Sequence, residues 1–141
     1  MDIPSMLTIH RQPAAIPMAG HPVRAGFPSP ASDHMDNAIN LHDYLVADPP
    51  ATFMVRVRGD SMRDAGILDN DILVVDKGLP PRHGDIVIAV IDGEFTVKRL
   101  HSKEGRCLLL AANPAYPAIE PADGQELQIW GVVTACVRKL K

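Results

Sequence analysis

Two residues of the chain have side chains that together could break a peptide bond, and the first is Ser61. It lies in Gly-Asp-Ser-Met at 59–62, where a segment of alternating apolar and basic residues gives way to a glycine-led turn. Such a turn can expose a hydroxyl and point backbone amides at a developing oxyanion. The tetrapeptide alone is a weak signal, because a serine after Gly-Asp at a strand end is more often a turn-forming residue.

Lys98 is the residue that could activate this hydroxyl. The period of two in an extended segment puts Phe95 and Val97 on one side and Thr96 and Lys98 on the other. Periodicity alone favours a solvent-exposed lysine. A general base must instead be partly buried and neutral, with a pKa lowered by a few units from about 10.4. We therefore treat Ser61 as a candidate nucleophile and Lys98 as its candidate base.

Histidine offers the other route to an activated serine. His83 precedes a turn glycine and is expected to shape that turn, and His101 is expected to follow a strand and to be solvated. Nothing in the sequence pairs a histidine with an orienting carboxylate, so a Ser–His–Asp triad is not favoured. The six histidines also lack metal-ligand spacing, and we expect no metal and no cofactor.

The composition is that of one soluble globular domain with a tail. Of the 141 residues, 46% are hydrophobic and 22% are charged, and the net charge of −3 argues against binding bare nucleic acid through its phosphates. Cys107 and Cys136 are expected to be small core residues in a reducing compartment. The apolar run at 86–91 is too short for a membrane helix and the N-terminus lacks a signal pattern, so we expect a cytoplasmic protein.

The first part of the chain is rich in proline. Six of the 13 prolines fall in the first 30 residues, and each withholds a backbone donor and restricts its predecessor. We expect residues 1–36 to form an extended, flexible N-terminal arm. A short helix should follow, capped by Asn40 and stopped by Asp48-Pro49-Pro50.

The remaining elements, which must position Ser61 and Lys98, read as short strands. Asp92-Gly93 is a strong two-residue hairpin signal between two of them. Short strands at short intervals indicate a small sandwich or a partly closed barrel. The sequence thus predicts a mostly β domain over 37–141, with strands at 53–58, 72–75, 86–91, 94–100, 106–111 and 127–138.

Four blocks of the sequence, in this order, are distinctive: 59–62, 69–76, 83–89 and 92–98. Together they resemble the LexA/UmuD family of self-cleaving serine peptidases, and the likeness is greatest to its UmuD branch. It covers nearly the whole chain from about Gly26. The resemblance implies the peptidase fold of that family, with Ser61 as nucleophile and Lys98 as general base.

The resemblance also implies that the cleaved bond is Ala25–Gly26. A small residue suits a shallow pocket, and glycine allows close backbone approach. The best-known enteric members carry cysteine where this chain has Ala25. Ala19–Gly20 and Ala65–Gly66 are chemically similar bonds, and only the match at 26–31 selects Ala25 over Ala19. Ala65–Gly66 is expected in a loop of the folded domain and is the poorer substrate.

Further expectations about partners come from the same resemblance. It implies homodimerisation, cleavage stimulated by a RecA–single-stranded DNA filament, and a role as accessory subunit of an error-prone translesion polymerase of UmuC type. It implies no sequence-specific DNA binding.

Three other interpretations of the sequence compete with this one. A LexA-type repressor needs a DNA-binding domain that about 25 proline-rich residues cannot supply. A signal peptidase also uses Ser–Lys chemistry but needs a membrane anchor. The alternative from a different class is a non-catalytic β interaction module, in which the arm is a docking peptide.

Overall fold

The computed structural model describes residues 15–28 and 35–141. The chain divides into two compact units, of which the first ends at Leu45 and the second begins at Val46. In the first unit, strand β1 (Ile16–Ala19) pairs antiparallel with β2 (Met35–Ile39), and the register shifts between Ile16 and Met18. The sequence predicted an extended, flexible arm here, and the pairing of these two strands is a finding of the structure. A two-stranded ribbon accommodates Pro17 because each strand is paired on one side only, so a missing N–H can face outward.

A one-turn helix, α2 (Leu41–Leu45), follows this ribbon. The backbone N–H of Asp43 donates to Oδ1 of Asn40 at 3.2 Å, so the predicted N-terminal cap is confirmed. The expected limit of the arm at residue 36 falls inside β2. The division into an arm over 1–36 and a domain over 37–141 therefore stays a proposal.

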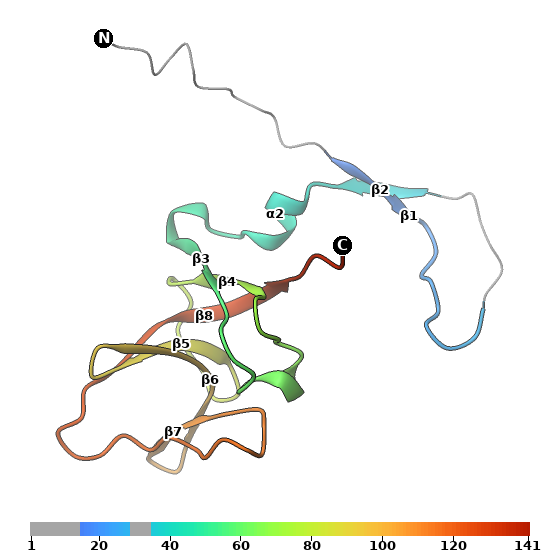
Figure 1. Ribbon diagram of the computed structural model, residues 1–141. Coiled ribbons are helices and arrows are strands. Elements are labelled where there is room, and N and C mark those ends of the chain that lie inside the picture. Colours follow the sequence, from blue (N-terminus) through green and yellow to red (C-terminus); the bar gives the residue numbers. More distant parts are fainter. Residues whose placement is uncertain (1–14, 29–34) are drawn as a thin grey trace, which may run out of the picture. The chain divides into compact units, whose positions relative to one another are not determined.

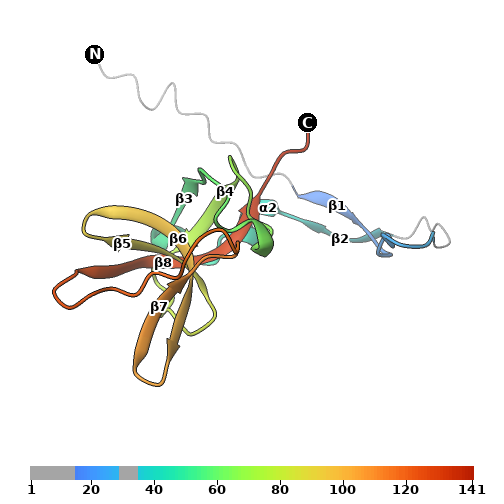
Figure 2. The same ribbon diagram turned by 60° about the horizontal axis from the view of Figure 1, so that its bottom comes forward.

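The second unit is built on one antiparallel sheet of six strands, in the order β3-β4-β8-β5-β6-β7 (Figures 1 and 2). Single 3-10 turns lie before β3 and between β3 and β4, at Pro49–Ala51 and Arg63–Ala65. The mostly β prediction is confirmed, and the sheet stays open within 46–141. The strands are β3 (Thr52–Arg56), β4 (Ile72–Asp76), β5 (Ile86–Ile91), β6 (Glu94–Lys103), β7 (Arg106–Leu110) and β8 (Leu127–Val137).

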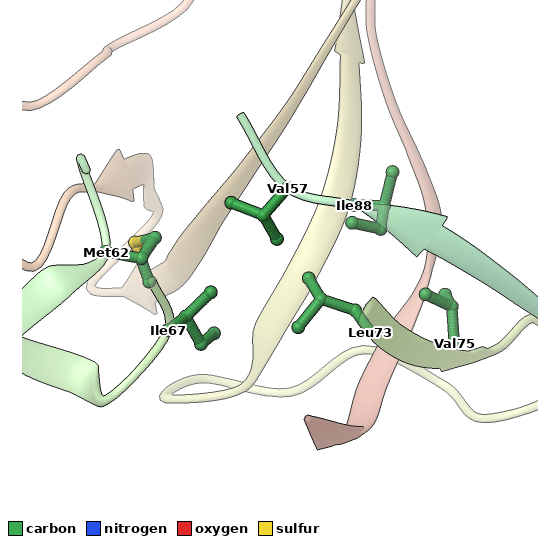
Figure 3. Packing of buried hydrophobic residues seen from close by; sticks show 6 residues of the cluster. All are labelled: Val57, Met62, Ile67, Leu73, Val75 and Ile88. Atoms are coloured by element: carbon green, nitrogen blue, oxygen red, sulfur yellow. The ribbon is translucent and has the colours of Figure 1, made fainter. Parts of the chain in front are cut away.

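Strand β5 lies between two hydrophobic clusters, which explains its unbroken apolar sequence. Ile88 packs into one cluster while Val87 and Ala89 pack into the other, because successive side chains of a strand point to opposite faces. The first cluster includes Met62, the residue after Ser61 (Figure 3). Its buried members are Val57, Met62, Ile67, Leu73, Val75 and Ile88, and those of the second are Val87, Ala89, Leu100, Leu109 and Val132.

The prediction that both cysteines are core residues is wrong. Cys107 and Cys136 are exposed and carry free thiols. Each lies near the end of its strand: Cys107 follows the first residue of β7, and Cys136 precedes the last residue of β8. Hydrophobic character alone did not reveal that these strand ends extend beyond the core.

No helix within residues 15–28 and 35–141 is long and apolar enough to cross a membrane.

Candidate active site

Ser61 sits in the turn that follows β3, and this turn is held firmly at both ends. Gly59 has φ of +93°, a backbone conformation that side chains with a Cβ rarely adopt. The N–H of Gly59 donates to Oδ1 of Asp69 at 2.8 Å. On the other side of Ser61, Met62 is only 1% exposed and anchors the turn in the first cluster. The backbone that carries the Ser61 hydroxyl is thus held in place on both sides.

A second loop, residues 112–116 after β7, braces the same turn. The Ala112 N–H donates to the Ser61 carbonyl at 2.8 Å. Nδ2 of the buried Asn113 donates to the Asp60 carbonyl at 2.9 Å, and the Tyr116 hydroxyl donates to Asp60 Oδ1 at 2.7 Å. Sequence reasoning missed these residues, because hydrogen bonds that span about fifty residues leave no local pattern.

Lys98 lies in β6 opposite Val87 of β5, and only 7% of it is exposed. Its Nζ makes three hydrogen bonds. It lies 3.1 Å from Ser61 Oγ, 2.7 Å from Thr96 Oγ1 and 3.0 Å from the Val97 carbonyl. The structure therefore brings together the two residues that the sequence singled out, and the exposed lysine that periodicity alone favoured is not found.

The contacts of the amine suit both of its protonation states. An ammonium has three donors for three acceptors. A neutral amine has two, and if these stay on Thr96 and Val97, its lone pair is left to accept from the Ser61 hydroxyl. Thr96, which sequence reasoning placed on the same side of the strand as Lys98, is thereby a positioning partner of the amine.

Burial lowers the pKa of Lys98 from its ordinary value. The three groups that hold the amine are an alcohol, a second alcohol and a carbonyl, none of which carries a charge. No ion pair among residues 15–28 and 35–141 includes Lys98. The charged form is thus disfavoured by desolvation without a counter-ion to restore it, which is the condition for a lysine to act as a base.

A cleft of about 450 Å³ opens in front of the two side chains. Its lining includes Ser61 and Lys98 together with apolar residues such as Val55, Leu73 and Ile88. Residues of β3 and the turn after it form one part of the lining, and the first half of β6 forms another. An apolar cleft of this size beside a hydroxyl and an amine can hold a short extended peptide.

His83 and His101, the histidines considered as activators of a serine, make contacts away from Ser61. Nδ1 of His83 accepts from the Ser102 N–H at 3.1 Å, and its ring meets the His101 ring edge-on at 5.0 Å. Burial, Lys103 and His101 together lower the pKa of His83. His101 was expected after the strand and solvated, but it is half-buried inside β6, because that strand continues to Lys103.

The three Ala-Gly bonds differ in their surroundings. Ala25 and Gly26 are exposed and lie outside regular strands, whereas Ala19 is the last residue of β1. Ala65 is the last residue of a 3-10 turn in the second unit, and the N–H of Gly66, which follows it, donates to the Arg63 carbonyl at 3.0 Å. Its expected place inside the folded domain is therefore confirmed.

Within the described parts of the chain, no group of three or more His, Cys, Asp or Glu side chains could hold a metal ion.

Comparison with known proteins places the chain in a family. Residues 17–134 match the family Peptidase S24-like. Protein SamA of Salmonella typhimurium is 53% identical over 117 residues, which are 83% of this chain and 81% of SamA. Protein MucA of Escherichia coli is 47% identical over 122 residues, 85% of this chain and 82% of MucA. The LexA repressor of Bordetella pertussis is 39% identical over 123 residues, which span 87% of this chain and 56% of the repressor. The chain therefore belongs to the Peptidase S24-like family, in agreement with its resemblance to the LexA/UmuD self-cleaving peptidases.

Proposed function

We propose that this chain is a serine endopeptidase that cleaves its own Ala25–Gly26 bond, with Ser61 as nucleophile and Lys98 as general base. The observation that carries the proposal is the 3.1 Å contact between Ser61 Oγ and the Nζ of a buried lysine that has no counter-ion among the described residues. Membership of the Peptidase S24-like family supports it.

The chemistry begins with a neutral Lys98. As Ser61 Oγ bonds to the carbonyl carbon of Ala25, its proton passes to Lys98 Nζ, and the carbonyl oxygen becomes an oxyanion. When the intermediate collapses, the bond to Gly26 nitrogen breaks and Lys98 returns the proton to that nitrogen. Water then attacks the Ser61 ester and gives a proton to Lys98. Lys98 passes this proton to Ser61 Oγ as the ester bond breaks, which regenerates the hydroxyl, and the released Ala25 carboxylic acid loses its remaining proton to solvent.

Because the scissile bond and Ser61 belong to one chain, tethering removes much of the entropy cost of bringing them together. Cleavage must then be held back until it is needed. In our proposal the arm mostly stays out of the cleft, or Lys98 stays protonated, until a RecA–single-stranded DNA filament favours the docked state. Cleavage between two copies of the chain would follow the same chemistry.

The biological role that we propose is SOS mutagenesis in the cytoplasm. The processed chain would act as a homodimer and as accessory subunit of an error-prone translesion polymerase of UmuC type. The support for this role is the LexA/UmuD-type family and the identity to SamA and MucA.

The dyad is tested by incubating the wild type, Ser61→Ala and Lys98→Ala in parallel and measuring intact mass. The wild type should lose its first 25 residues, and both variants should stay at full length while showing the circular dichroism of the folded chain. Continued cleavage in either variant would refute the dyad. N-terminal sequencing of the product should begin at Gly26, and a product beginning at Gly20 would move the site to Ala19–Gly20.

A surface cluster favours a second candidate function, a non-catalytic interaction module. Trp130, which is 40% exposed, meets Phe53 and Phe95 edge-on with ring centroids 6.2 and 4.8 Å away. Lys77 Nζ lies 5.3 Å from the centroid of the same indole. Exposed aromatic groups of this kind suit a protein partner. A wild-type chain that never shortens, alone or with activated RecA, would favour this candidate.

A further inference from the structure

A single acidic side chain lies on the cleft that holds Ser61 and Lys98. Asp60 precedes Ser61 and is the one carboxylate among the described residues that line this cleft. The other charged lining residues are Arg56, Arg58 and Lys98. Because Asp60 is exposed, its charge lies at the rim rather than on the apolar floor.

Asp60 is held in place by loop 112–116. The Tyr116 hydroxyl binds Oδ1 at 2.7 Å, and Asn113 Nδ2 binds the backbone carbonyl at 2.9 Å. Within the described residues, the hydrogen bond from Tyr116 is the one that reaches this carboxylate. Oδ2 therefore remains available as an acceptor for a ligand at a fixed position beside the nucleophile.

The neighbouring arginines do not neutralise this carboxylate. Nη1 of Arg56 and Nη1 of Arg58 donate to Oδ1 of Asn70 at 3.1 and 3.0 Å. None of the ion pairs in the described part of the chain includes Asp60. Asp60 thus makes no ion pair within the described residues, so a basic side chain of a bound peptide could pair with it.

The segment that would enter the cleft carries such a side chain. Arg24 directly precedes Ala25 and is exposed, in the sequence Val-Arg-Ala-Gly at 23–26. In an extended peptide, successive side chains point to opposite sides. If Val23 and Ala25 face the apolar floor, Arg24 faces the rim.

We propose that Asp60 is a specificity-determining residue that binds the guanidinium of Arg24 when the arm is docked for cleavage. The inference rests on the proposed self-cleavage at Ala25–Gly26. Arg24 lies in the unit that ends at Leu45 and Asp60 in the unit that begins at Val46, so this ion pair belongs to the docked state. Charge-assisted hydrogen bonds between guanidinium and carboxylate combine attraction with a defined geometry, which would hold the scissile carbonyl at Ser61.

The test is a double-mutant cycle on the rate of self-cleavage, using Asp60→Asn, Arg24→Gln and the double variant. Asn at position 60 keeps an oxygen that can accept from Tyr116 but removes the charge. Each single change should slow cleavage about three- to tenfold, and the double variant should be no slower than the slower single variant. Raising the salt concentration should slow the wild type more than either single variant. Rate losses that multiply in the double variant would overturn the proposal.

Two controls separate this ion pair from other effects. Arg58→Gln changes a charge in the same cleft, and its effect should multiply with that of Arg24→Gln. Asp60→Asn should leave the pH at which the cleavage rate levels off unchanged; a displaced profile would mean that Asp60 acts through Lys98 and would also overturn the proposal.

A last readout does not depend on cleavage. In the uncleavable Ser61→Ala chain bound to a RecA–single-stranded DNA filament, which favours the docked state, Asp60→Asn should shift the Arg24 side-chain NMR resonance, whereas Arg58→Gln should not. An Arg24 resonance that ignores Asp60→Asn would overturn the ion pair, even where no variant cleaves. Cleavage that continues in Ser61→Ala would instead overturn the proposed function.

Discussion

Three side chains that can carry a charge are buried in the second unit, Asp71, Asp76 and Lys98, and the surroundings of Asp71 and Lys98 are opposite. Asp71, 1% exposed, accepts from Arg138 Nε and Nη2, each at 2.7 Å, and from Leu68 N–H at 2.7 Å. Lys98 is 7% exposed, and its hydrogen bonds within the described part of the chain go to two hydroxyls and a carbonyl. The charge of Asp71 is thus balanced by a paired arginine, whereas Lys98 has no paired anion among the described residues.

The pKa shifts express this difference. Hydrogen bonds from Arg138 and Leu68 hold the pKa of Asp71 well below its usual range, so the carboxylate stays charged. Burial lowers the pKa of Lys98, which favours the neutral amine. The Asp71 carboxylate has a paired cation and can stay charged without destabilising the fold. A buried lysine without a paired anion lowers the stability of the fold when it is protonated, and such a group is typical of a site that needs a neutral base.

The largest effect should come from replacing Lys98 by methionine, which has similar length and no charge. Self-cleavage should fall by about a thousandfold or more, since a general base typically contributes 10²–10⁴. The free energy of unfolding at pH 7 should be unchanged or higher, because a desolvated amine is replaced by an apolar chain. Urea unfolding of Lys98→Met beside the wild type measures this, and a marked loss of stability would mean that Lys98 is structural.

The pH dependence of stability sharpens the same point. The pKa of Lys98 is lower in the folded chain than in the unfolded chain, so between the two values the unfolded chain binds more protons. The free energy of unfolding of the wild type, relative to Lys98→Met, should therefore rise with pH in that window. Below the lowered pKa the penalty of burying the charge is present in full. A difference in the free energy of unfolding between the wild type and Lys98→Met that stays constant with pH would contradict the lowered pKa of Lys98.

Asp71→Asn should give the opposite result, lowering stability at neutral pH. The carboxylate contribution is present above the ordinary pKa of an aspartate and is lost as pH falls below it, toward the lowered pKa of the folded chain. The difference in urea midpoint between the wild type and Asp71→Asn should be clear at pH 7 and should shrink at pH 3. A difference that is equal at both values would show that charge is not what Asp71 contributes.

A smaller effect is expected from Thr96→Val, which removes one acceptor from Lys98 Nζ and preserves side-chain shape. Cleavage should slow by about tenfold because the amine is less well oriented. Its pKa should fall further, because an acceptor stabilises ammonium more than amine, so the rate should level off at a lower pH. Thr96→Ser should restore both properties, and rate profiles of the two variants provide the measurement.

The smallest effect should come from Cys136→Ser. Cys136 Sγ lies 3.2 Å from Asp71 Oδ2, and a serine hydroxyl can donate there as well. The free energy of unfolding should change by no more than about 0.5 kcal/mol, as for most exposed sites. A larger loss would mean that the thiol, and not only Arg138, compensates the carboxylate.

Much of the fold was predictable because its strands, turns and helix cap have recognisable patterns in the local sequence. The strand at 86–91 and the hairpin at Asp92-Gly93 were placed correctly from apolar runs and turn chemistry. Asn40 was placed correctly as a helix cap. The ribbon of β1 and β2 was missed, since it joins a proline-containing segment to one that lacks a strong strand pattern.

At the site, residue identity and family resemblance led to Ser61 and Lys98. The residues that position Ser61 and Lys98 could not be predicted in this way, because their contacts join segments that are far apart in the sequence. Asp69 reaches Gly59, and Asn113 and Tyr116 reach Asp60, only because the chain folds back on itself. Burial of Lys98 likewise depends on neighbouring strands, which is why periodicity alone favoured an exposed side chain.

The rate of spontaneous self-cleavage as a function of pH tests the central claim most directly. If Lys98 must be neutral to accept the Ser61 proton, the rate should rise tenfold per pH unit and level off at the lowered pKa of Lys98, below the ordinary lysine value of about 10.4. A rate that stays constant from neutral to alkaline pH would contradict the account.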